Sequence, residues 1–448
     1  MRVNRREFVG GMVAASVGAW AGSGPALAFG RTAQAPLVDA ASLRRRTEEL
    51  SVFGRPEGGT FADGVSRVAY SDADLAGRRY FMDLMRAAGL EPRIDAAGNI
   101  YGRREGTDPS LPTIVFGSHI DSVPSGGNFD GDLGSLAALG AIEAMDRDGL
   151  RTAHPLEMVV WSAEEGVAFG RGLAGSRIVA GDIKPEDLEK VWNGFTRADG
   201  MRRLGGNPDR VMEAVREEGA HKAYLELHIE QGGKLQQSGV PVGVVQGIVS
   251  IQRHRVVITG VANHAGTTPM PIRQDAMLAV SHLTIAVREI VMAMPGPQVG
   301  TVGHVEVSPN APNVIPGMVI ATVELRDLSP EKLVRLADQI KARAATIGAS
   351  TRTTIDITPL GGNPPALAAS EVQDAVEGAA DSLGLGSTRM PSGAGHDAQM
   401  MAQLSPMGMI FVPSIGGISH SPKELTSWED CANGANVLLR SVLAVDAL

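Results

Sequence analysis

Two apolar segments separated by a helical pattern constrain the fold of this chain more than any other feature. "PTIVFGSHID" (residues 112–121) and "LEMVVWSAEEG" (156–166) each have the pattern of a buried strand, and "GSLAALGAIEAMDRDG" (134–149) that of a helix ending at Gly149. Strand, helix and strand at this spacing form a βαβ unit in a parallel or mixed sheet covered by helices. Such sheets bind ligands at the carboxyl ends of their strands, where the polar clusters of this chain fall.

Further elements extend this first domain in both directions. "SDADLAGRRYFMDLMRAAGL" (71–90) has the periodicity of an amphipathic helix, and "PRIDAAGNIYGRREG" (92–106) that of a hairpin. From residue 361 the chain returns to a helix, a buried strand in "SPMGMIFVPS" (405–414) and a last helix. We therefore predict one α/β domain, with a mixed sheet and helices on both faces, built from residues 29–246 and 361–448.

The segment between these two parts has a different pattern. Residues 247–360 alternate in the order β-α-β-β-α-β, which is typical of a split βαβ sandwich. We expect a smaller α+β domain inserted here, serving as a lid and a dimerisation surface. A second domain that carries part of a site would have to close on the first, with hinges near residues 246 and 361.

Composition excludes several classes of function. The chain has 448 residues, a formal net charge of −9 and a single cysteine, Cys431. The acidic balance argues against a nucleic-acid partner. One cysteine excludes an internal disulfide and a cysteine-rich metal site, so any metal site must use His, Asp and Glu.

The first 28 residues have the pattern of an export signal. The pair Arg5-Arg6 precedes Phe8, an apolar run and an Ala-x-Ala site at Ala26 and Ala28. This order is typical of a signal peptide, and the paired arginines favour the twin-arginine route. We expect a periplasmic or secreted protein with no stable membrane association after cleavage. The alternatives are an uncleaved N-terminal anchor, for which the apolar run is short, and a chance basic start; no other segment is expected to span a membrane.

Chemically active side chains follow several of the predicted strands. His119, His228 and His420 each stand at or beyond a short apolar run, and Glu164 with Glu165 ends the strand at 156–161. Asp130 follows His119 across a glycine-rich loop that can fold back over the sheet edge. His, Asp and Glu without Cys suit Zn²⁺, Mn²⁺, Co²⁺ or Ni²⁺, and one carboxylate can bridge two such ions. The residues therefore fit a two-metal hydrolase.

Seven motifs carry a resemblance to a known family. The chain resembles the M20-type metallopeptidase clan and, within it, the hydantoinase/carbamoylase amidases, over residue 40 to the C-terminus. The motifs are "GSHIDSVPSGGNFDGDLG", "EEG", "LHIEQG", "ANHAGTTPM", "NVIP" with "ELRD", "SGAGHDA" and "FVPSIGGISHSPKE".

This resemblance implies a dimetal centre. His119 and His420 bind one metal, Glu165 and His228 bind the other, and Asp130 bridges the two. The two divalent ions are expected to be Zn²⁺, or alternatively Mn²⁺, Co²⁺ or Ni²⁺.

The resemblance also implies catalytic roles beside the metals. Glu164 is the general base and later the acid, although a further metal ligand is the alternative role for it. Asp121 orients His119 through its carboxylate. His264, on the inserted domain, polarises the scissile carbonyl across a dimer; its alternative is to cap the turn at "NHAGTTP".

Four more residues resemble the substrate contacts of the family. Gln231 would bind the substrate amide, and Asn313 with Arg326 the substrate carboxylate, which an arginine fork fits. The alternatives are a buried structural amide for Gln231, a turn residue for Asn313 and a strand salt bridge for Arg326. His396 either contacts substrate or caps a helix.

The resemblance implies metal-dependent hydrolysis of a ureido or N-carbamoyl C–N bond in a small molecule by a homodimer. N-carbamoyl-L-amino acids are the expected substrates, with allantoate or ureidoglycolate as the alternative. The motif forms "HIEQG" and "ANHAGTTPM" favour the ureido-type amidases over an M20 peptidase or aminoacylase. The complete set of ligands argues against a non-catalytic binding protein.

Overall fold

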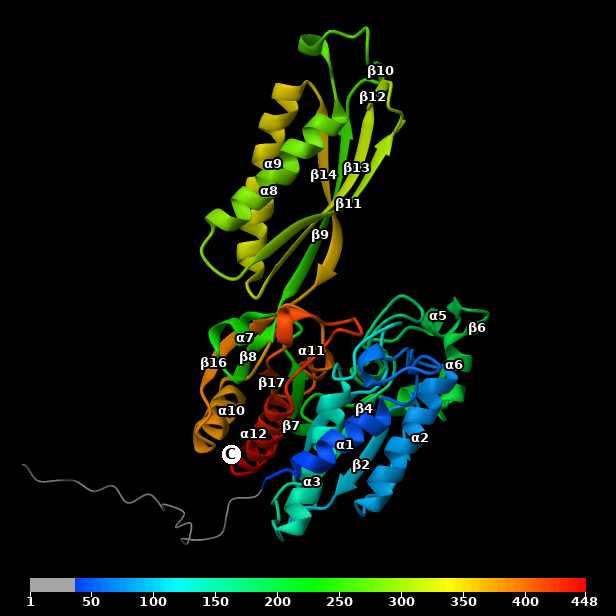
Figure 1. Ribbon diagram of the computed structural model, residues 1–448, viewed down its shortest axis with the longest axis vertical. Helices are drawn as coiled ribbons and strands as arrows, with labels where there is room; N and C mark the ends of the chain where they lie inside the picture. The colour runs from blue at the N-terminus through cyan, green and yellow to red at the C-terminus, as the bar shows by residue number, and fades with distance from the viewer. Residues whose placement is uncertain (1–36) are drawn as a thin grey trace, which may run out of the picture. The chain divides into compact units, whose positions relative to one another are not determined.

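The computed structural model describes residues 37–448, so the predicted signal peptide at residues 1–28 lies outside the described residues. The described chain contains a nine-stranded sheet, called the main sheet, and a four-stranded one, called the second sheet (Figure 1). The main sheet has the order β1 (Pro92–Ile94), β2 (Ile100–Arg104), β4 (Leu156–Trp161), β3 (Thr113–His119), β7 (His221–Ile229), β17 (Met407–Val412), β8 (Val242–Ile248) and β15 (Ala366–Leu367), and β16 (Ser387–Ser392) also pairs with β8.

Strand directions in the main sheet are mixed, as predicted. β3 runs parallel to both β4 and β7, and β7 runs parallel to β17. β1, β2 and β4 form an antiparallel edge, and β8 pairs with β17 in antiparallel register. The four central strands β4, β3, β7 and β17 therefore all end at the same edge of the sheet.

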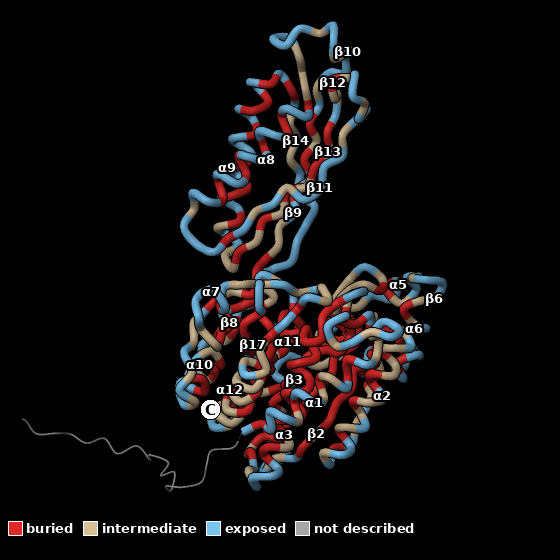
Figure 2. Tube along the Cα trace, viewed as in Figure 1, coloured by how far each residue is buried: buried red, intermediate tan, exposed pale blue. Residues whose placement is uncertain are grey.

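Both faces of the main sheet are buried, because successive side chains of a strand point to opposite faces. Ile114 and Phe116 of β3 join a core beneath the long helices, whereas Val115 joins a second core. Figure 2 shows the continuous buried interior around these strands. The long helices are α1 (Ala40–Leu50), α2 (Asp72–Ala87), α3 (Asp132–Arg147), α10 (Ser370–Ser382) and α12 (Trp428–Asp446). The short elements are α4 (Ala174–Val179), α5 (Pro185–Leu188), β5 (Val191–Trp192), β6 (Phe195–Thr196), α6 (Arg197–Arg203), α7 (Lys234–Ser238) and α11 (Ala398–Met401).

The second sheet has the predicted chain order and a core of its own. Its strands are antiparallel in the order β11-β13-β9-β14, and apolar residues such as Val256, Leu283 and Leu336 form its core. Its elements are β9 (Ser250–Thr259), α8 (Ala276–Ala293), β11 (Val299–Ser308), β13 (Met318–Asp327), α9 (Pro330–Thr351) and β14 (Thr354–Asn363), with a small ladder of β10 (Asn263–His264) and β12 (Val314–Ile315). Movement of this part as a lid stays a prediction.

Helix α8 differs from what the sequence predicted about membrane spans. It is long and apolar enough to cross a membrane by length and composition. Its Ala279, Leu283 and Val287 are buried in the core of the second sheet, which identifies α8 as a core helix. Its opposite face leaves Leu278, Ile285 and Met292 exposed.

Candidate metal centre

The parallel order of the central strands gathers the predicted metal ligands at one edge of the main sheet. His119 is the last residue of β3, and His228 lies one residue before the end of β7. Glu164 and Glu165 follow β4, and His420 follows β17. Because the carboxyl ends of neighbouring parallel strands meet, residues up to about 300 positions apart reach one place.

The glycine-rich loop after β3 brings Asp130 back to the same edge. Asp130 is followed by Gly131, whose φ of 68° is in the left-handed region. A Cβ atom at position 131 would collide with the imidazole of His119, so only glycine allows this approach. Helix α3 then begins at Asp132, whose buried carboxylate pairs with Arg67.

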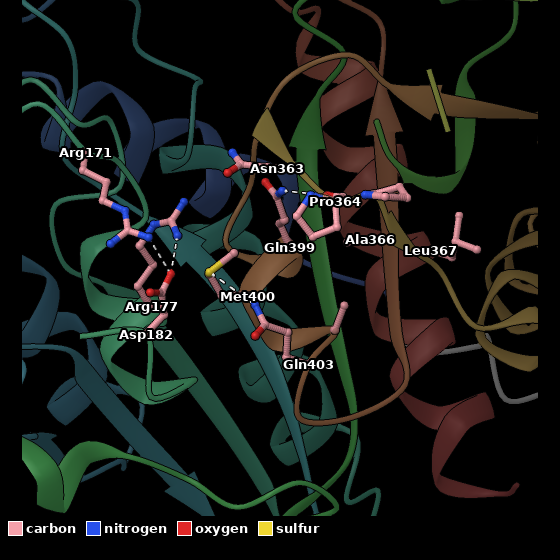
Figure 3. Close-up of a pocket in the computed structure, with 12 residues that line it drawn as sticks. Arg171, Arg177, Asp182, Asn363, Pro364, Ala366, Leu367, Gln399, Met400 and Gln403 are labelled. Atoms are coloured by element: carbon pink, nitrogen blue, oxygen red, sulfur yellow. Dashed lines mark hydrogen bonds and ion pairs between the residues drawn. The ribbon is translucent and has the colours of Figure 1, made fainter. Parts of the chain in front are cut away.

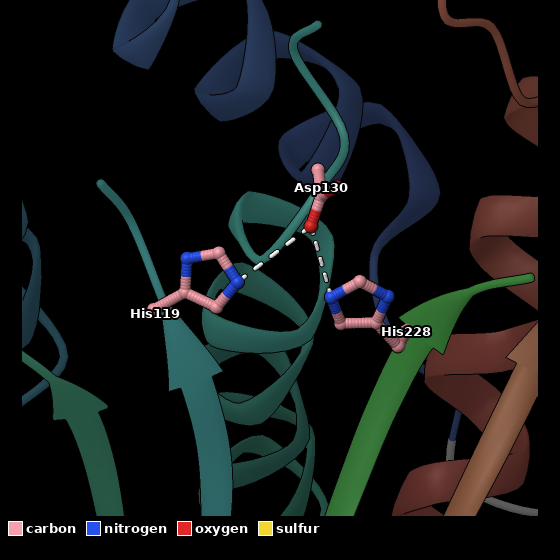
Figure 4. A group of neighbouring side chains, drawn as sticks. All are labelled: His119, Asp130 and His228. Carbon is pink, nitrogen blue, oxygen red and sulfur yellow. Dashed lines mark ion pairs between the residues drawn. The ribbon is translucent and has the colours of Figure 1, made fainter. Parts of the chain in front are cut away.

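The two oxygens of Asp130 face different groups of side chains. Oδ1 lies 3.1 Å from Nε2 of His228 and 3.6 Å from Nε2 of His119 (Figure 4). Oδ2 lies 3.3 Å from Nε2 of His420, which is also 3.3 Å from Oε2 of Glu165. One carboxylate thus serves two candidate ion sites at once, as a bridging ligand requires.

This grouping corrects the pairing of ligands expected from the sequence. His119 was expected to share an ion with His420, and Glu165 with His228. The structure instead brings His119 together with His228, and Glu165 together with His420, with Asp130 in both groups. The reason is the strand order: β3 and β7 are neighbours, whereas His420 lies in a loop that folds back towards Glu165.

Backbone carbonyls orient both buried histidines. Nδ1 of His119 lies 3.0 Å from the carbonyl oxygen of Asp121, and Nδ1 of His228 lies 2.9 Å from that of Ile229. With Nδ1 donating to a carbonyl, Nε2 of each ring keeps its lone pair towards Asp130. The expected contact between the Asp121 carboxylate and His119 is therefore made by the Asp121 backbone, and the carboxylate lies 3.7 Å from the ring.

The Asp121 carboxylate instead holds the two adjacent glutamates. It accepts hydrogen bonds from the backbone N–H groups of Glu164, at 3.0 Å, and Glu165, at 3.2 Å. Ala163 and Gly166, on either side, both have positive φ angles, so the chain turns sharply here. The turn aims Glu165 at His420, whereas Oε2 of Glu164 lies 3.7 Å from Nε2 of His119.

The pKa values of Glu164 and Glu165 are both raised. Burial raises the pKa of Glu164 well above its usual value, and the Glu165 carboxylate adds to the effect. Burial and the charge of Asp130 raise the pKa of Glu165 to about 8. Burial lowers the pKa of His119, but the carboxylates of Glu164 and Asp130 outweigh it and raise that pKa overall. Crowded carboxylates of this kind are stabilised when cations lie among them.

An unsatisfied atom supports the fit of divalent cations. Oε1 of Glu165 is buried without a hydrogen-bond partner among the described residues, and a buried carboxylate oxygen needs a cation or a donor. Imidazole and carboxylate ligands suit Zn²⁺, Mn²⁺, Co²⁺ and Ni²⁺. His119, Asp130, Glu165, His228 and His420 therefore fit a metal centre by residue type and by grouping.

Comparison with known proteins identifies the family of this chain. Residues 115–444 match the sequence profile of peptidase family M20/M25/M40. The chain belongs to this family. It is 40% identical over 407 residues to the N-carbamoyl-L-amino acid amidohydrolase of Geobacillus stearothermophilus, covering 91% of this chain and 98% of the relative. The allantoate amidohydrolase of Escherichia coli is 36% identical over 391 residues, covering 87% and 94%. A hydantoinase/carbamoylase amidase from Burkholderia multivorans superposes with a TM-score of 0.86 at 34% identity, covering 93% and 100%.

A cavity of about 260 Å³ opens beside the metal centre of this M20 chain. Gln231 and His396 both line it, together with Gly395. Nε2 of Gln231 donates to Oδ2 of Asp130 at 2.7 Å, while its Oε1 is buried without a partner among the described residues. His396 is buried against His228, and its Nε2 lies 2.9 Å from the Ser392 hydroxyl.

The remaining predicted residues lie away from the metal centre, with Arg326 on β13 of the second sheet and His264 and Asn313 at the separate β10–β12 ladder. His264 is exposed, and its Nδ1 accepts hydrogen bonds from the backbone N–H groups of Gly266 and Thr267. Asn313 is exposed beside it, because β10 pairs with β12. Arg326 bonds to Glu324 and donates to the carbonyl of Gly393 at 2.7 Å. The turn and salt-bridge contacts foreseen as alternatives for His264 and Arg326 are thus both present.

Two residues that the sequence motifs did not single out hold Asp130 in place. Oε1 of Glu424 accepts from the backbone N–H groups of Phe129 and Asp130, at 2.9 and 3.0 Å. Ser419 lies between Glu424 and Asp130, with its hydroxyl 3.0 Å from Oδ2 of Asp130. Both residues stand in the motif "GISHSPKE", so their closeness to His420 was the signal available.

Proposed function

We propose that this protein is a metal-dependent amidohydrolase that cleaves the C–N bond of a ureido compound, with N-carbamoyl-L-amino acids as the favoured substrates. The observation that carries the proposal is the Asp130 carboxylate, whose two oxygens face two separate groups of candidate ligands. The buried carboxylate of Glu164 lies beside these groups, 3.7 Å from His119. The relatives named above support the ureido class of substrate. The kind and number of metal ions belong to the proposal.

The residues of the centre divide the work of hydrolysis. His119, Asp130, Glu165, His228 and His420 would hold divalent ions, which when bound would lower the pKa of water and polarise a carbonyl oxygen. Glu164 takes a proton from the attacking water and delivers it to the leaving nitrogen. Burial raises the pKa of Glu164, which makes its carboxyl a better proton acceptor than an exposed glutamate. An N-carbamoyl amino acid and one water then yield the amino acid, CO₂ and ammonia.

Ammonia release from a substrate panel tests the proposal. The panel contains N-carbamoyl-L-amino acids, allantoate, ureidoglycolate and N-acetyl-L-amino acids, each with Mn²⁺, Co²⁺, Ni²⁺ or Zn²⁺. We expect turnover of the N-carbamoyl compounds. Preferred hydrolysis of the N-acetyl compounds would instead identify an aminoacylase, and binding without ammonia release would identify a non-catalytic protein.

Allantoate hydrolysis is the second candidate function. It rests on the similarity to the allantoate amidohydrolase of Escherichia coli. Allantoate carries two ureido groups on one carbon, so the same centre can attack it. A kcat/KM for allantoate above that for every N-carbamoyl-L-amino acid would replace the first proposal with this one.

The proposal includes a homodimer formed through the second sheet. Leu278, Ile285 and Met292 are exposed along one face of α8, at a spacing of seven residues. An exposed apolar stripe of this kind favours contact with a second copy. In such a dimer, His264 of one subunit acts in the site of its partner. Sedimentation tests this, and a fully active monomer contradicts it.

Export is a further part of the proposal. Its basis is the sequence of residues 1–28 alone. Fractionation of cells that express the full chain is expected to place the mature protein outside the cytoplasm. Replacement of Arg5 and Arg6 by lysine is expected to abolish that export if the twin-arginine route is used.

A further inference from the structure

A second cavity, of about 450 Å³, adjoins the one beside the metal centre. The two cavities share Arg177, Asn363 and Gln399 in their linings. A ligand that occupies the inner cavity can therefore extend past these three side chains into the outer one. A volume of this size exceeds what a small substituent needs, and ligand sites are typically about 300–1,000 Å³.

The outer cavity has one charged side and one apolar side. Figure 3 shows Arg171 and Arg177 directed at Asp182 on one side, with Ala366 and Leu367 away from them on the other. Leu367 is exposed, as a residue at the rim of an open cavity is. Gln399, between the two sides, is an amide that can accept or donate.

The charged side has an excess of one positive charge. A single oxygen of Asp182, Oδ2, accepts from Nη2 of Arg171 at 2.7 Å and from Nη1 of Arg177 at 2.6 Å. Asp182 is the only acidic side chain in the lining among the described residues. One carboxylate therefore serves two guanidinium groups.

Both guanidinium groups keep donors free for a further anion. Arg177 is largely buried, and its Nε donates to the carbonyl of Gly172, which fixes its orientation. Burial and the charge of Arg171 together lower the pKa of Arg177, as expected for two cations brought close. Nη2 of Arg177, and Nε and Nη1 of Arg171, make no hydrogen bond within the described chain. A second carboxylate at this place would complete the set of charges.

We propose that the outer cavity binds the side chain of the substrate and selects an acidic one, with N-carbamoyl-L-glutamate as the representative ligand. The aliphatic stem of such a side chain packs against Ala366 and Leu367, and its carboxylate meets Arg171 and Arg177. This inference rests on the proposed function, because it extends the ureido substrate from the metal centre into the next cavity.

The test compares two substrates that differ only in charge. The kcat/KM of the metal-loaded enzyme is measured for N-carbamoyl-L-glutamate and for N-carbamoyl-L-glutamine, and their ratio is the readout. We expect a ratio of about ten or more in favour of glutamate, because a charged hydrogen bond is about twice as strong as a neutral one. Arg171→Gln should lower the ratio about tenfold, and Arg171→Glu should invert it.

A matched arginine outside the cavity controls for general effects of charge. Arg202 on α6 is about half exposed and pairs with Asp199 and Asp209. Arg202→Gln should leave the ratio unchanged. An equal ratio in the wild-type enzyme and in Arg171→Gln overturns the inference, even when both substrates are hydrolysed and the proposed function stands.

A binding experiment separates failure of the inference from failure of the proposed function. Calorimetric titration of the metal-loaded Glu164→Gln variant with each of the two compounds needs no turnover. Tighter binding of the glutamate compound, lost on adding Arg171→Gln, supports the acidic subsite even if the wild-type enzyme releases no ammonia. Equal binding of both compounds overturns it.

Discussion

The carboxyl edge of the main sheet and the separate β10–β12 ladder both carry residues that the family resemblance implicates, but the two regions differ in how far these residues are buried. At the edge of the main sheet, His119, Asp130 and His228 are buried and lie within a few ångströms of one another. In the β10–β12 ladder, His264 and Asn313 are exposed; Nδ1 of His264 accepts from the backbone of the following turn, and the Asn313 carbonyl accepts from the backbone N–H of Ala265.

This difference separates two tasks of the proposed reaction. At the edge of the main sheet, a backbone carbonyl fixes each of the imidazoles of His119 and His228, an arrangement that suits the proposed ion binding and proton transfer. In the proposed reaction, the exposed residues of the β10–β12 ladder would reach substrate only after another surface closes on them. Loss of a residue from the first region should therefore affect metal binding or chemistry directly, and loss from the second should affect chemistry alone.

The largest effect is expected from the two adjacent glutamates. Glu164→Gln should lower kcat by roughly 10⁴-fold, at the upper end of the range for general acid–base catalysis, because Glu164 serves as base and then as acid. Its metal content, measured by atomic absorption, should equal that of the wild type. Glu165→Gln should lose metal together with activity, because Glu165 faces His420. If Glu164→Gln loses metal and Glu165→Gln keeps it, the two roles are reversed.

A smaller effect is expected from His264. His264→Ala should lower kcat by about 10²-fold, the size expected for removal of one oxyanion donor, without changing metal content or unfolding temperature. Its Nδ1 accepts from two backbone N–H groups, so Nε2 carries the proton that such a donor needs. His304, exposed on β11 of the second sheet, is the matched control, and His304→Ala should be fully active. Equal activity of the two variants would remove His264 from the mechanism.

Much of the fold was predictable because its strands and helices follow from hydrophobic patterns between residues close in sequence. The continuous apolar runs within residues 112–121 and 156–161 identified β3 and β4 as buried strands, and the helical period between them identified α3. The β-α-β-β-α-β order of the second sheet was predicted in the same way. Each of these predictions depends on neighbours in sequence, which share a face of a strand or helix.

The grouping of the ligands was not predictable, because it depends on strand order. The sequences around His119 and His228 do not indicate that β3 and β7 are neighbouring strands. Likewise, "SHID" alone does not reveal that the carbonyl of Asp121 binds His119 while its carboxylate binds the backbone of the following turn. Such contacts are made between distant segments, so they follow from the assembled sheet.

Glu424 tests whether the preformed edge depends on more than its ligands. Glu424→Ala removes the acceptor for the backbone N–H groups of Phe129 and Asp130, and we expect metal affinity to fall about 10–100-fold. Glu424→Gln keeps an acceptor at the same place and should recover most of that affinity. Titration with Co²⁺, followed by its absorption spectrum, measures both variants. An unchanged affinity in Glu424→Ala would show that Asp130 is held by its ligand contacts alone.

The smallest expected effect, on stability, concerns the two histidines near the ends of β7. His221 and His228 are both buried but have different charged neighbours. Burial lowers the pKa of His228, but Asp130 and Glu226 outweigh it and raise that pKa overall. At the opposite end, burial and then Arg216 lower the pKa of His221 to about 4, with no carboxylate to oppose them. The carboxylates of the metal edge, and not burial itself, therefore decide the charge of a buried histidine in this strand.

This contrast predicts how stability depends on pH. Because its native pKa lies below the unfolded value of about 6.5, His221 takes up a proton on unfolding, so its contribution is complete above that pH and is lost as the pH falls towards 4. Relative to His221→Asn, the wild type should lose on the order of 1–2 kcal/mol of unfolding free energy between pH 7 and pH 5. Urea unfolding of both proteins without metal measures this difference, and the comparison cancels the groups that they share. A difference independent of pH would show that His221 is protonated in the folded protein, and that burial at the amino end of β7 does not exclude the charge.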